Sequence, residues 1–387
     1  MTRNILKKET IAVMYGGNSA EHEISVITAL QCIQAIDSHK YNIVPIYLAL
    51  NGKWYTGEKL LDKNFYRKMP SLFSSVQEVS LLPDPSYEGF VFLSSKKTLP
   101  VDVCLLAFHG QNGEDGCIQG LLELADIPYT GGSVSASSLA MNKYLCKTVV
   151  RAHGIPVLPS VLVHKKNAIC GFEQTRDMIF KTLQFPLFVK PNHLGSSIGV
   201  SRADTFEELN AGLAKVFQYD DQAIIEPCLE NILEINMAVL DGKPPRASLV
   251  ETPIPTRGAL SYEDKYMRQG SKKSGNRASG MASLSRLIDP DTLDSEIKTQ
   301  VQEFGLNAFQ ILECSGVCRF DFMMDTKTGS VYFNEVNPIP GSFSFYLWDQ
   351  LSPKILFTDL LESLIVSAKE KKTLQRSLNR EFGFHAL

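Results

Sequence analysis

The chain has 387 residues, of which 44% are apolar and 21% charged. That balance is typical of a soluble globular protein with large buried cores, and it excludes a disordered or fibrous chain. Lysine and arginine number 39 against 42 acidic residues, a formal charge of −3, so no basic excess indicates a nucleic-acid partner. At roughly 100 to 200 residues per domain, this length predicts two or three packed units.

The beginning of the chain carries positive charge without the apolar stretch of a secretory signal. No later segment reaches the roughly 18 apolar residues of a membrane-spanning helix. We therefore expect a cytoplasmic protein with no membrane partner. The eight cysteines are scattered, and the pair Cys314 and Cys318 has no second pair or histidine to complete a zinc site. Buried free thiols are expected.

The first unit begins with a predicted strand over 10–15, the turn Gly16-Gly17-Asn18-Ser19 and a helix. Four apolar residues of that helix share one face at helical spacing: Ile24, Ile27, Leu30 and Ile33. Further strands are expected over 42–50 and 102–108. This alternation predicts a parallel α/β unit, in which ligands lie beyond the carboxyl ends of the strands.

Two more units are predicted, so that the boundaries fall at 1–132, 133–234 and 235–387. The second contains an expected helix over 139–150 and strands over 157–163, 186–191 and 223–227. The third contains expected strands over 247–251, 316–325 and 331–337 and a long helix over 292–312.

The strongest local signal is a pair of strands in which polar residues alternate with apolar ones. If residues 327–329 form a three-residue hairpin loop with Gly329 left-handed, Thr326 pairs with Ser330. Counting back then brings two cross-strand pairs onto one face: Asp321 opposite Glu335 and Arg319 opposite Asn337.

Carboxylates that face each other repel unless a cation lies between them, and hard oxygen ligands favour Mg²⁺. Arg319 on the same face suits a phosphate. A solvated sheet face explains the same alternation, so both interpretations stay open at this point.

A second group of polar residues suits a nucleotide. Lys190 ends an apolar strand just before Gly195-Ser196-Ser197-Ile198-Gly199, whose backbone amides can approach a phosphate. Lys143 lies near a helix start, and Glu226 ends a later strand. Each lysine alone is equally explained as a surface charge, but their order along the chain suits a nucleotide between two sheets.

Three further features have two interpretations each. The basic, glycine-containing segment within 258–286, which includes Lys265, is either a cationic flap over phosphates or a solvated loop. Glu21, beside a helix start, either binds an ammonium group or supports the helix dipole. His109 ends a strand and is either a site residue or a packed histidine.

Two common nucleotide fingerprints are absent from the sequence. The Gly16-Gly17 turn is not a G-x-G-x-x-G motif, and no G-x-x-x-x-G-K-[ST] exists. A nicotinamide oxidoreductase is therefore disfavoured, and a P-loop enzyme is excluded.

Taken in order, several segments resemble the D-alanine:D-alanine ligase family of ATP-grasp enzymes over nearly the whole chain. They are Gly16-Gly17-Asn18-Ser19-Ala20-Glu21, His109-Gly110-Gln111-Asn112-Gly113-Glu114-Asp115-Gly116, Tyr129-Thr130-Gly131, Met141-Asn142-Lys143, Lys190-Pro191, Gly195-Ser196-Ser197-Ile198-Gly199, Tyr262-Glu263-Asp264-Lys265-Tyr266, Arg319-Phe320-Asp321 and Asn334-Glu335-Val336-Asn337.

The resemblance implies an α/β fold: an N-terminal Rossmann-like domain that binds substrate, followed by a two-lobed ATP-grasp fold. It implies two Mg²⁺ ions, replaceable by Mn²⁺, a cytoplasmic homodimer, and the small-molecule substrates ATP and D-alanine. The family phosphorylates one D-alanine to an acyl phosphate, which the amine of the second attacks.

The resemblance also assigns roles to residues. Those implied for ATP are Lys143, Lys190, Ser197, Glu226, Glu234 and Lys265. Those implied for the metal are Asp321, Glu335 and Asn337. Those implied around the first amino acid and the oxyanion are Glu21, Ser196, Tyr266, His109, Arg319 and the Gly341 backbone.

One segment departs from the family pattern. After Asn337 the family reads Thr-x-Pro-Gly-Met/Phe-Thr, with a serine a few residues on that holds the second substrate; here Tyr346 takes the place of that serine. Ser342 or Ser344 is a candidate replacement. The sequence favours a D-alanine:D-alanine ligase of peptidoglycan precursor synthesis; the alternatives are another acceptor, such as D-lactate or D-serine, or a nucleotide-binding regulator without catalysis.

Overall fold

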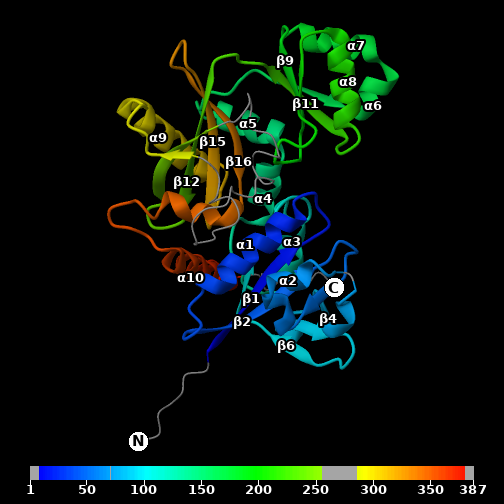
Figure 1. The fold of residues 1–387 in the computed structure, drawn as a ribbon, viewed down its shortest axis with the longest axis vertical. Coiled ribbons are helices and arrows are strands. Elements are labelled where there is room, and N and C mark those ends of the chain that lie inside the picture. Colours follow the sequence, from blue (N-terminus) through cyan, green and yellow to red (C-terminus); the bar gives the residue numbers. More distant parts are fainter. Residues whose placement is uncertain (1–7, 70, 255–285, 380–387) are drawn as a thin grey trace, which may run out of the picture.

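The computed structural model describes residues 8–69, 71–254 and 286–379 (Figure 1). Two expected site residues, Lys265 and Tyr266, lie outside these ranges. The expected flap over 258–286 also lies outside them, apart from Arg286. Within them the chain forms three sheets with helices packed against them, in the order of the three expected units.

The first unit is a seven-stranded sheet in the order β6-β5-β4-β3-β2-β1-β7. Only β1 (Glu9–Gly16), β2 (Tyr41–Leu48) and β7 (Val103–Leu106) run parallel. The remaining strands are antiparallel: β3 (Trp54–Thr56), β4 (Gln77–Leu81), β5 (Gly89–Phe92) and β6 (Thr98–Pro100). The expected parallel arrangement therefore holds for β1, β2 and β7 but is wrong for the other four strands. Apart from the one between β3 and β4, their connections are too short for a crossover between parallel neighbours.

Helix α1 (His22–Ala35) packs between β1 and the kinked segment η6 (Gly341–Leu347). Because it is covered on two sides, its buried face is wider than the stripe expected from the sequence. Ile24 and Leu30 are buried as expected, but Ile27 and Ile33 are only partly buried. Two small helices, α2 (Lys63–Tyr66) and α3 (Cys117–Leu124), complete this unit.

The second unit contains an antiparallel sheet in the order β10-β9-β11-β8. Its strands are β8 (Val161–His164), β9 (Leu187–Pro191), β10 (Ser201–Ala203) and β11 (Gln222–Pro227). Its helices are α6 (Lys165–Cys170), α7 (Phe172–Phe180) and α8 (Phe206–Val216). The single helix expected over 139–150 is two helices, α4 (Val134–Met141) and α5 (Lys143–Ala152). Asn142 separates them, because its side chain accepts a hydrogen bond from Leu145 N and so begins a new helix.

The third unit is an antiparallel sheet in the order β14-β13-β12-β15-β16. Its strands are β12 (Ile232–Leu240), β13 (Arg246–Pro253), β14 (Arg286–Ile288), β15 (Val317–Asp325) and β16 (Val331–Asn337). Helix α9 (Ser295–Ile311) covers one face, against a core that includes Phe320, Phe322 and Phe333. Helix α10 (Phe357–Arg376) returns to pack on the first unit beside α1 and β7 (Figure 1).

The hairpin of β15 and β16 brings Asp321 opposite Glu335 and Arg319 opposite Asn337, as expected. The expected turn is nevertheless wrong: Ser330 pairs with Asp325, not Thr326, so the loop has one more residue. A β-bulge after Asp321 shifts the register back by one residue. The two differences cancel, which is why the predicted pairs are correct.

No helix in the described ranges is both long and apolar enough to cross a bilayer. The cysteines that the structure describes carry free thiols; Cys32, Cys104, Cys146 and Cys318 are buried, whereas Cys117 is exposed.

The first and third units meet where Gly316 lies against Gly131. A Cβ atom on Gly316 would lie 2.9 Å from Gly131 Cα, and Gly316 has a φ of +76°. Gly329 has a similar φ of +72°, but no atom lies within 4 Å of the place where its Cβ would be. We expect Gly316→Ala to lower the free energy of unfolding by about 2–4 kcal/mol, the sum of backbone strain and overpacking.

Gly329→Ala is the matched control. It should lower the free energy of unfolding by only about 1–2 kcal/mol, because it adds backbone strain without overpacking. Urea denaturation of both variants measures the difference. Equal losses in the two variants would show that the contact between Gly316 and Gly131 is not tight.

Candidate active site

Arg319 and Asp321 lie on the same face of β15 and form a buried bidentate ion pair. Arg319 Nε donates to Asp321 Oδ1 at 2.7 Å, and Nη2 donates to Oδ2 at 2.9 Å. Asn337 Nδ2 also donates to Asp321 Oδ2, at 3.1 Å. Burial lowers the pKa of Arg319, but the charge of Asp321 and its hydrogen bonds outweigh burial and raise that pKa well above its ordinary value. The Arg319 guanidinium is therefore charged at neutral pH.

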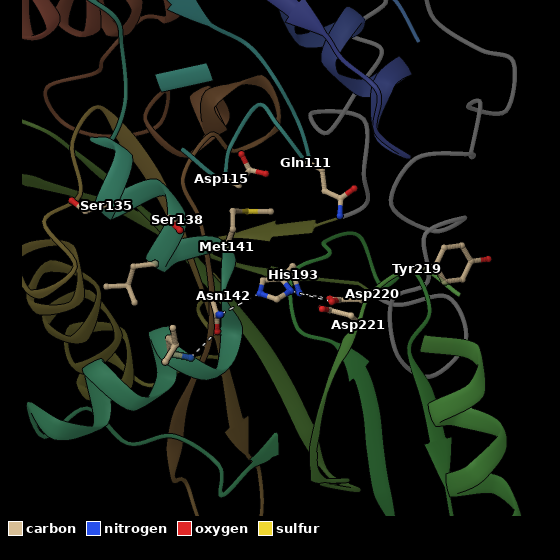
Figure 2. A pocket seen from close by; sticks show the side chains of 12 residues that line it. Gln111, Asp115, Ser135, Ser138, Met141, Asn142, His193, Tyr219, Asp220 and Asp221 are labelled. Atoms are coloured by element: carbon tan, nitrogen blue, oxygen red, sulfur yellow. Dashed lines mark hydrogen bonds and ion pairs between the residues drawn. The ribbon is translucent and has the colours of Figure 1, made fainter. Parts of the chain in front are cut away.

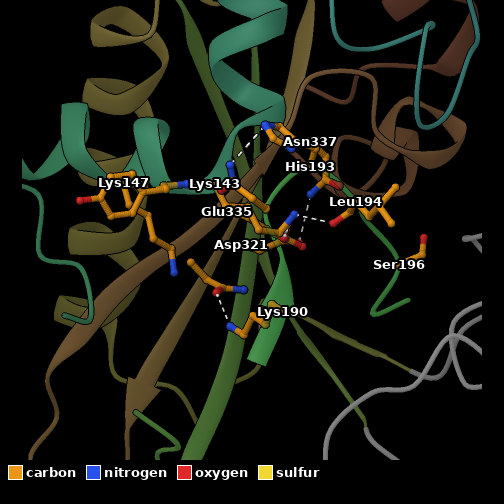
Figure 3. A network of polar contacts seen from close by, with 12 residues as sticks. Lys143, Lys147, Lys190, His193, Leu194, Ser196, Asp321, Glu335 and Asn337 are labelled. Carbon is orange, nitrogen blue, oxygen red and sulfur yellow. Dashed lines mark hydrogen bonds and ion pairs between the residues drawn. The ribbon is translucent and has the colours of Figure 1, made fainter. Parts of the chain in front are cut away.

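The bulge in β16 turns two consecutive polar side chains to this face. Phe333 and Val336 point into the core, so Asn334 and Glu335 between them both lie on the polar side. Glu335 Oε2 lies 3.2 Å from Lys143 Nζ, and Asn334 Oδ1 accepts from Lys190 Nζ at 3.5 Å (Figure 3). The hairpin thus reaches both lysines that the sequence singled out.

Lys190 and Lys147 bind the same buried carboxylate. Lys190 Nζ donates to Glu226 Oε2 at 2.7 Å, and Lys147 Nζ contacts Glu226 Oε1. Burial raises the pKa of Glu226, but the two ammonium groups outweigh it and lower that pKa to about 2. Glu226 therefore fixes the position of Lys190. Lys147 was missed by sequence reasoning, although it lies one helical turn after Lys143 and so faces the same way.

The glycine loop contacts the first unit through Glu21. Ser196 Oγ donates to Glu21 Oε1, and a Cβ on Gly195 would lie 3.4 Å from Glu21 Oε2. Ser196 and Ser197 both adopt the left-handed conformation, with φ of 54° and 58°. This loop therefore lies over the first unit at Glu21, which brings Ser196 next to Glu21 as the family resemblance implies.

His109 is buried beside Arg319, and its Nε2 lies 2.9 Å from Thr28 Oγ1. Burial and the positive charge of Arg319 lower the pKa of His109 to about 4. The imidazole is therefore neutral at pH 7. Since an unfolded histidine titrates near 6.5, His109 favours the folded state above that pH and loses this contribution as the pH falls through about 4.

Glu114, in the loop after His109, is a buried carboxylate that sequence reasoning missed. Its Oε2 accepts from Gly110 N at 2.6 Å, and its Oε1 accepts from Ile339 N at 3.3 Å. Burial and nearby Glu21 raise its pKa well above the ordinary value. Glu114 connects the first unit to the segment that follows β16.

That following segment is η6, which holds the three residues expected at the second substrate. Ser342 Oγ donates to Gln31 Oε1 at 2.6 Å, and Ser342 N donates to Thr28 Oγ1 at 3.3 Å. Ser342 and the two residues after it have φ near +50°, which turns the chain sharply beside Gly341. The hydroxyl of Ser342 is thus directed toward α1.

Tyr346 occupies a charged environment instead. Its hydroxyl donates to Glu251 Oε1 at 3.3 Å, and the Arg286 guanidinium lies 3.9 Å from its ring centroid. Arg286 Nη1 also donates to Glu251 Oε2 at 2.6 Å. Burial and the charge of Glu251 raise the pKa of Tyr346 to about 12, so the phenol stays protonated. Glu251 and Arg286 were not singled out from the sequence, because they come from strands far apart along the chain.

The structure therefore brings most of the sequence-predicted residues to one junction of the three units. Glu234 lies on β12 opposite Met323, on the sheet that carries the hairpin. Asn334 had a sequence signal: two polar residues in a row between Phe333 and Val336 break the strand alternation, which indicates a bulge.

The hairpin donors fit a divalent metal ion. Asp321, Glu335 and Asn337 offer two carboxylates and one amide on one face, and such oxygen donors suit Mg²⁺. Asn337 presents its Nδ2 to Asp321, so holding an ion requires this amide to turn over and present Oδ1. Lys143 on Glu335 and Arg319 on Asp321 balance the carboxylates here.

A pocket of about 530 Å³ opens beside this junction (Figure 2). Its lining comes from the first unit at Gln111 and Asp115, from α4 and Asn142, and from His193, Asp220 and Asp221. It reaches the start of α5 at Asn142 and Leu145.

The ion pairs of Glu226 with Lys147 and Lys190 have a measurable effect on stability. We expect Glu226→Gln to lower the free energy of unfolding by about 3–5 kcal/mol, because buried Lys147 loses its carboxylate. The stabilisation from Glu226 is fully present above the unfolded pKa of about 4.3 and is lost as the pH falls toward about 2. The variant should thus lose less stability than the wild type between pH 5 and 3.

Thermal unfolding at stepped pH measures both effects. Asp204→Asn, which removes an exposed ion pair with Arg202, is the control and should change stability little. Parallel stability curves for Glu226→Gln and the wild type would contradict the assigned pKa of Glu226.

The chain is similar to known proteins along nearly its whole length. Family models described as the N-terminus and C-terminus of D-ala D-ala ligase match residues 10–132 and 149–366. The chain is 35% identical over 368 residues to the D-alanine–D-alanine ligase of Thermosipho africanus, covering 94% of this chain and 95% of that protein.

Two solved structures are also similar. The D-alanine-D-alanine ligase from Coxiella burnetii has a TM-score of 0.78 and 30% identity, covering 95% of this chain and 96% of that one. The VanG D-Ala:D-Ser ligase from Enterococcus faecalis has a TM-score of 0.77 and 29% identity, covering 94% and 100%. By its sequence, its mixed α/β fold and both family models, this chain belongs to the D-alanine–D-alanine ligase family.

Proposed function

We propose that this protein is an ATP-dependent ligase that joins two molecules of D-alanine for peptidoglycan precursor synthesis. The observation that carries the proposal is the hairpin face of Arg319, Asp321, Glu335 and Asn337, which meets Lys143 and Lys190. A protein that only binds nucleotide has no need to gather metal donors beside phosphate-binding cations. The family match over both parts of the chain supports the same conclusion.

The cations suit the first step of the reaction, in which a D-alanine carboxylate oxygen attacks the γ-phosphorus and ADP leaves. Lys143, Lys190 and Arg319 would lie around the transferred phosphoryl group and stabilise its charge. The remaining residues proposed for the nucleotide are Ser197, Glu226, Glu234 and Lys265. Glu226 would act mainly through Lys190, since both of its oxygens already accept from lysines.

We propose that Asp321, Glu335 and Asn337 hold two Mg²⁺ ions, for which Mn²⁺ can substitute. When bound, such ions neutralise the phosphate oxygens of ATP. Arg319 holds the Asp321 carboxylate at this face through two hydrogen bonds before any ion arrives. Glu335 has the same relation to Lys143.

The first D-alanine would lie between the first unit and the glycine loop. Glu21 is the proposed partner of its ammonium group, and Ser196, with Tyr266, would keep the loop closed over it. Neutral His109 would lie near the substrate carboxylate without competing with Arg319 for it. In the second step the amine of the other D-alanine attacks the acyl carbon, phosphate leaves, and Arg319 with the Gly341 backbone would stabilise the oxyanion.

The second D-alanine would lie against η6, with Ser342 and Tyr346 as its proposed neighbours. A homodimer remains part of the proposal and is supported by the resemblance alone.

Phosphate release from ATP with single amino acids tests the proposal. With D-alanine alone, we expect release of phosphate and ADP and a product with the mass of D-alanyl-D-alanine. We expect Glu335→Gln to lower turnover by about 10²-fold or more while changing ATP affinity much less, because the ion that this carboxylate would hold stabilises the transferred phosphoryl group.

Added D-serine or D-lactate provides the competing arm. If phosphate is released only when one of these acceptors is present, then that acceptor, and not D-alanine, is the second substrate. The absence of turnover with every acceptor would contradict the proposed reaction. Wild-type turnover in Glu335→Gln would contradict the proposed metal site.

A further inference from the structure

The start of the glycine loop is held by an Asp–His pair that the proposed chemistry does not use. His193 follows β9 and stands two residues before Gly195. Asp220, whose side chain is 3% exposed, accepts from His193 N at 2.7 Å and contacts His193 Nδ1 at 3.0 Å. Asp220 also accepts from Gln222 N at 3.0 Å. The imidazole is therefore fixed from one side.

The other ring nitrogen lies between two amide groups. His193 Nε2 is 3.1 Å from Asn142 Nδ2 and 3.2 Å from Asn192 Nδ2. The orientation of both amides is set by backbone donors: Asn142 Oδ1 accepts from Leu145 N, and Asn192 Oδ1 accepts from Tyr144 N, each at 2.9 Å. Both amides therefore present N–H groups to the ring.

This arrangement determines the tautomer of His193. Because Nε2 faces two N–H donors, it must be an acceptor, and the ring proton is on Nδ1, where Asp220 accepts it. His193 thus accepts on one side and donates on the other. Exchanging the ring for a group that only donates would break the contact with the two asparagines.

Those two asparagines hold the beginning of α5. Lys143 N donates to Asn192 O at 3.1 Å, so that the first backbone donors of the helix are satisfied by Asn192 and Asn142. Lys143 is the first residue of this helix, and its Nζ donates to Leu194 O at 2.6 Å. The lysine is thus tied to the loop at both its backbone and its side chain.

We propose that His193, held by Asp220, is a positioning residue that sets the place of Lys143 relative to the glycine loop. This inference rests on the proposed function, because it takes Lys143 and the glycine loop to bind the phosphates of the nucleotide. His193 touches neither phosphate nor metal; it acts through Asn142 and Asn192. Figure 2 shows the ring between Asn142 and Asp220 at the edge of the pocket.

A metal site at the same place is the competing interpretation. Ligand atoms of His193, Asp220 and Asp221 lie within 4.8 Å of one another. Both oxygens of Asp220 already accept from N–H groups of His193, and Oδ1 also accepts from Gln222 N. An ion would have to displace these bonds, so the positioning role fits the observed contacts better.

Two substitutions at His193 separate its two contacts. In His193→Gln, the side-chain carbonyl can reach the position of Nε2 and accept from both asparagines. In His193→Asn, the shorter amide can still donate to Asp220 but cannot reach the asparagines. We expect His193→Asn to weaken MgADP binding and raise the KM for ATP by about tenfold, with a smaller change in kcat. We expect His193→Gln to stay within about threefold of the wild type.

The affinity for MgADP is measured by calorimetry, so the outcome does not depend on which amino acids are joined. His39→Asn, at an exposed turn, is the matched control and should bind MgADP as the wild type does. Equal weakening in His193→Gln and His193→Asn, or none in either, would overturn the proposal. Binding of one Zn²⁺ ion to the nucleotide-free wild type that is lost in both His193 variants would overturn the proposal in favour of the metal interpretation.

A second variant guards against a folding defect in His193→Asn. Asn142→Ser keeps an oxygen that can cap α5 but removes the N–H group that faces His193, without adding charge. We expect it to weaken MgADP binding in the same direction, and we expect the double variant with His193→Asn to be little weaker than either single variant. Fully additive losses would show that the two residues act separately.

Discussion

Charge balance in a confined space is the constraint on which this site depends. Asp321, Glu335 and Glu226 lie close to one another around one end of the hairpin, and carboxylates gathered in this way repel unless cations separate them. Each is paired: Asp321 with Arg319, Glu335 with Lys143, and Glu226 with Lys147 and Lys190. The site is therefore organised before substrate arrives, and a triphosphate with its metal ions brings charges of both signs that these groups can accept.

The division of labour among the cations follows from their burial. Lys147 is almost fully buried and bound to Glu226, so its role is to stabilise the buried carboxylate. Lys143 and Lys190 are more exposed, at 14% and 16% of their side chains, and face the hairpin. Backbone geometry supports the same division, because α5 carries Lys143 and Lys147 one turn apart. One helix thus supplies both a lysine that faces the hairpin and the buried lysine that shares Glu226 with Lys190.

Much of this could be read from the sequence, and the failures have physical causes. The cross-strand pairs of the hairpin were predicted correctly although its loop was not, since the bulge at Asn334 offsets the longer turn. Phe333 and Val336 are both buried with two residues between them, so a bulge is needed to turn both into the core, and the turn residues do not reveal it. The antiparallel half of the first sheet was missed because strand direction depends on connections, which short apolar runs do not reveal.

Pairings between distant segments were the hardest to foresee. Glu251, Arg286 and Tyr346 come together only after three separate strands and turns have packed. By contrast, Lys190, the glycine loop and Glu21 were found early, since their local sequences constrain the backbone by themselves. The network around His193 belongs to the first class: each member looks like an ordinary polar loop residue until the fold places it.

The central claim is that the hairpin face binds divalent ions, and crystals grown with Mn²⁺ and a non-hydrolysable ATP analogue test it most directly. The account predicts anomalous scattering peaks within roughly 2.0–2.4 Å of oxygens of Asp321, Glu335 and Asn337, next to the terminal phosphates. Manganese found instead at His193, Asp220 and Asp221, with the hairpin oxygens still bonded only to arginine and lysine, would contradict it.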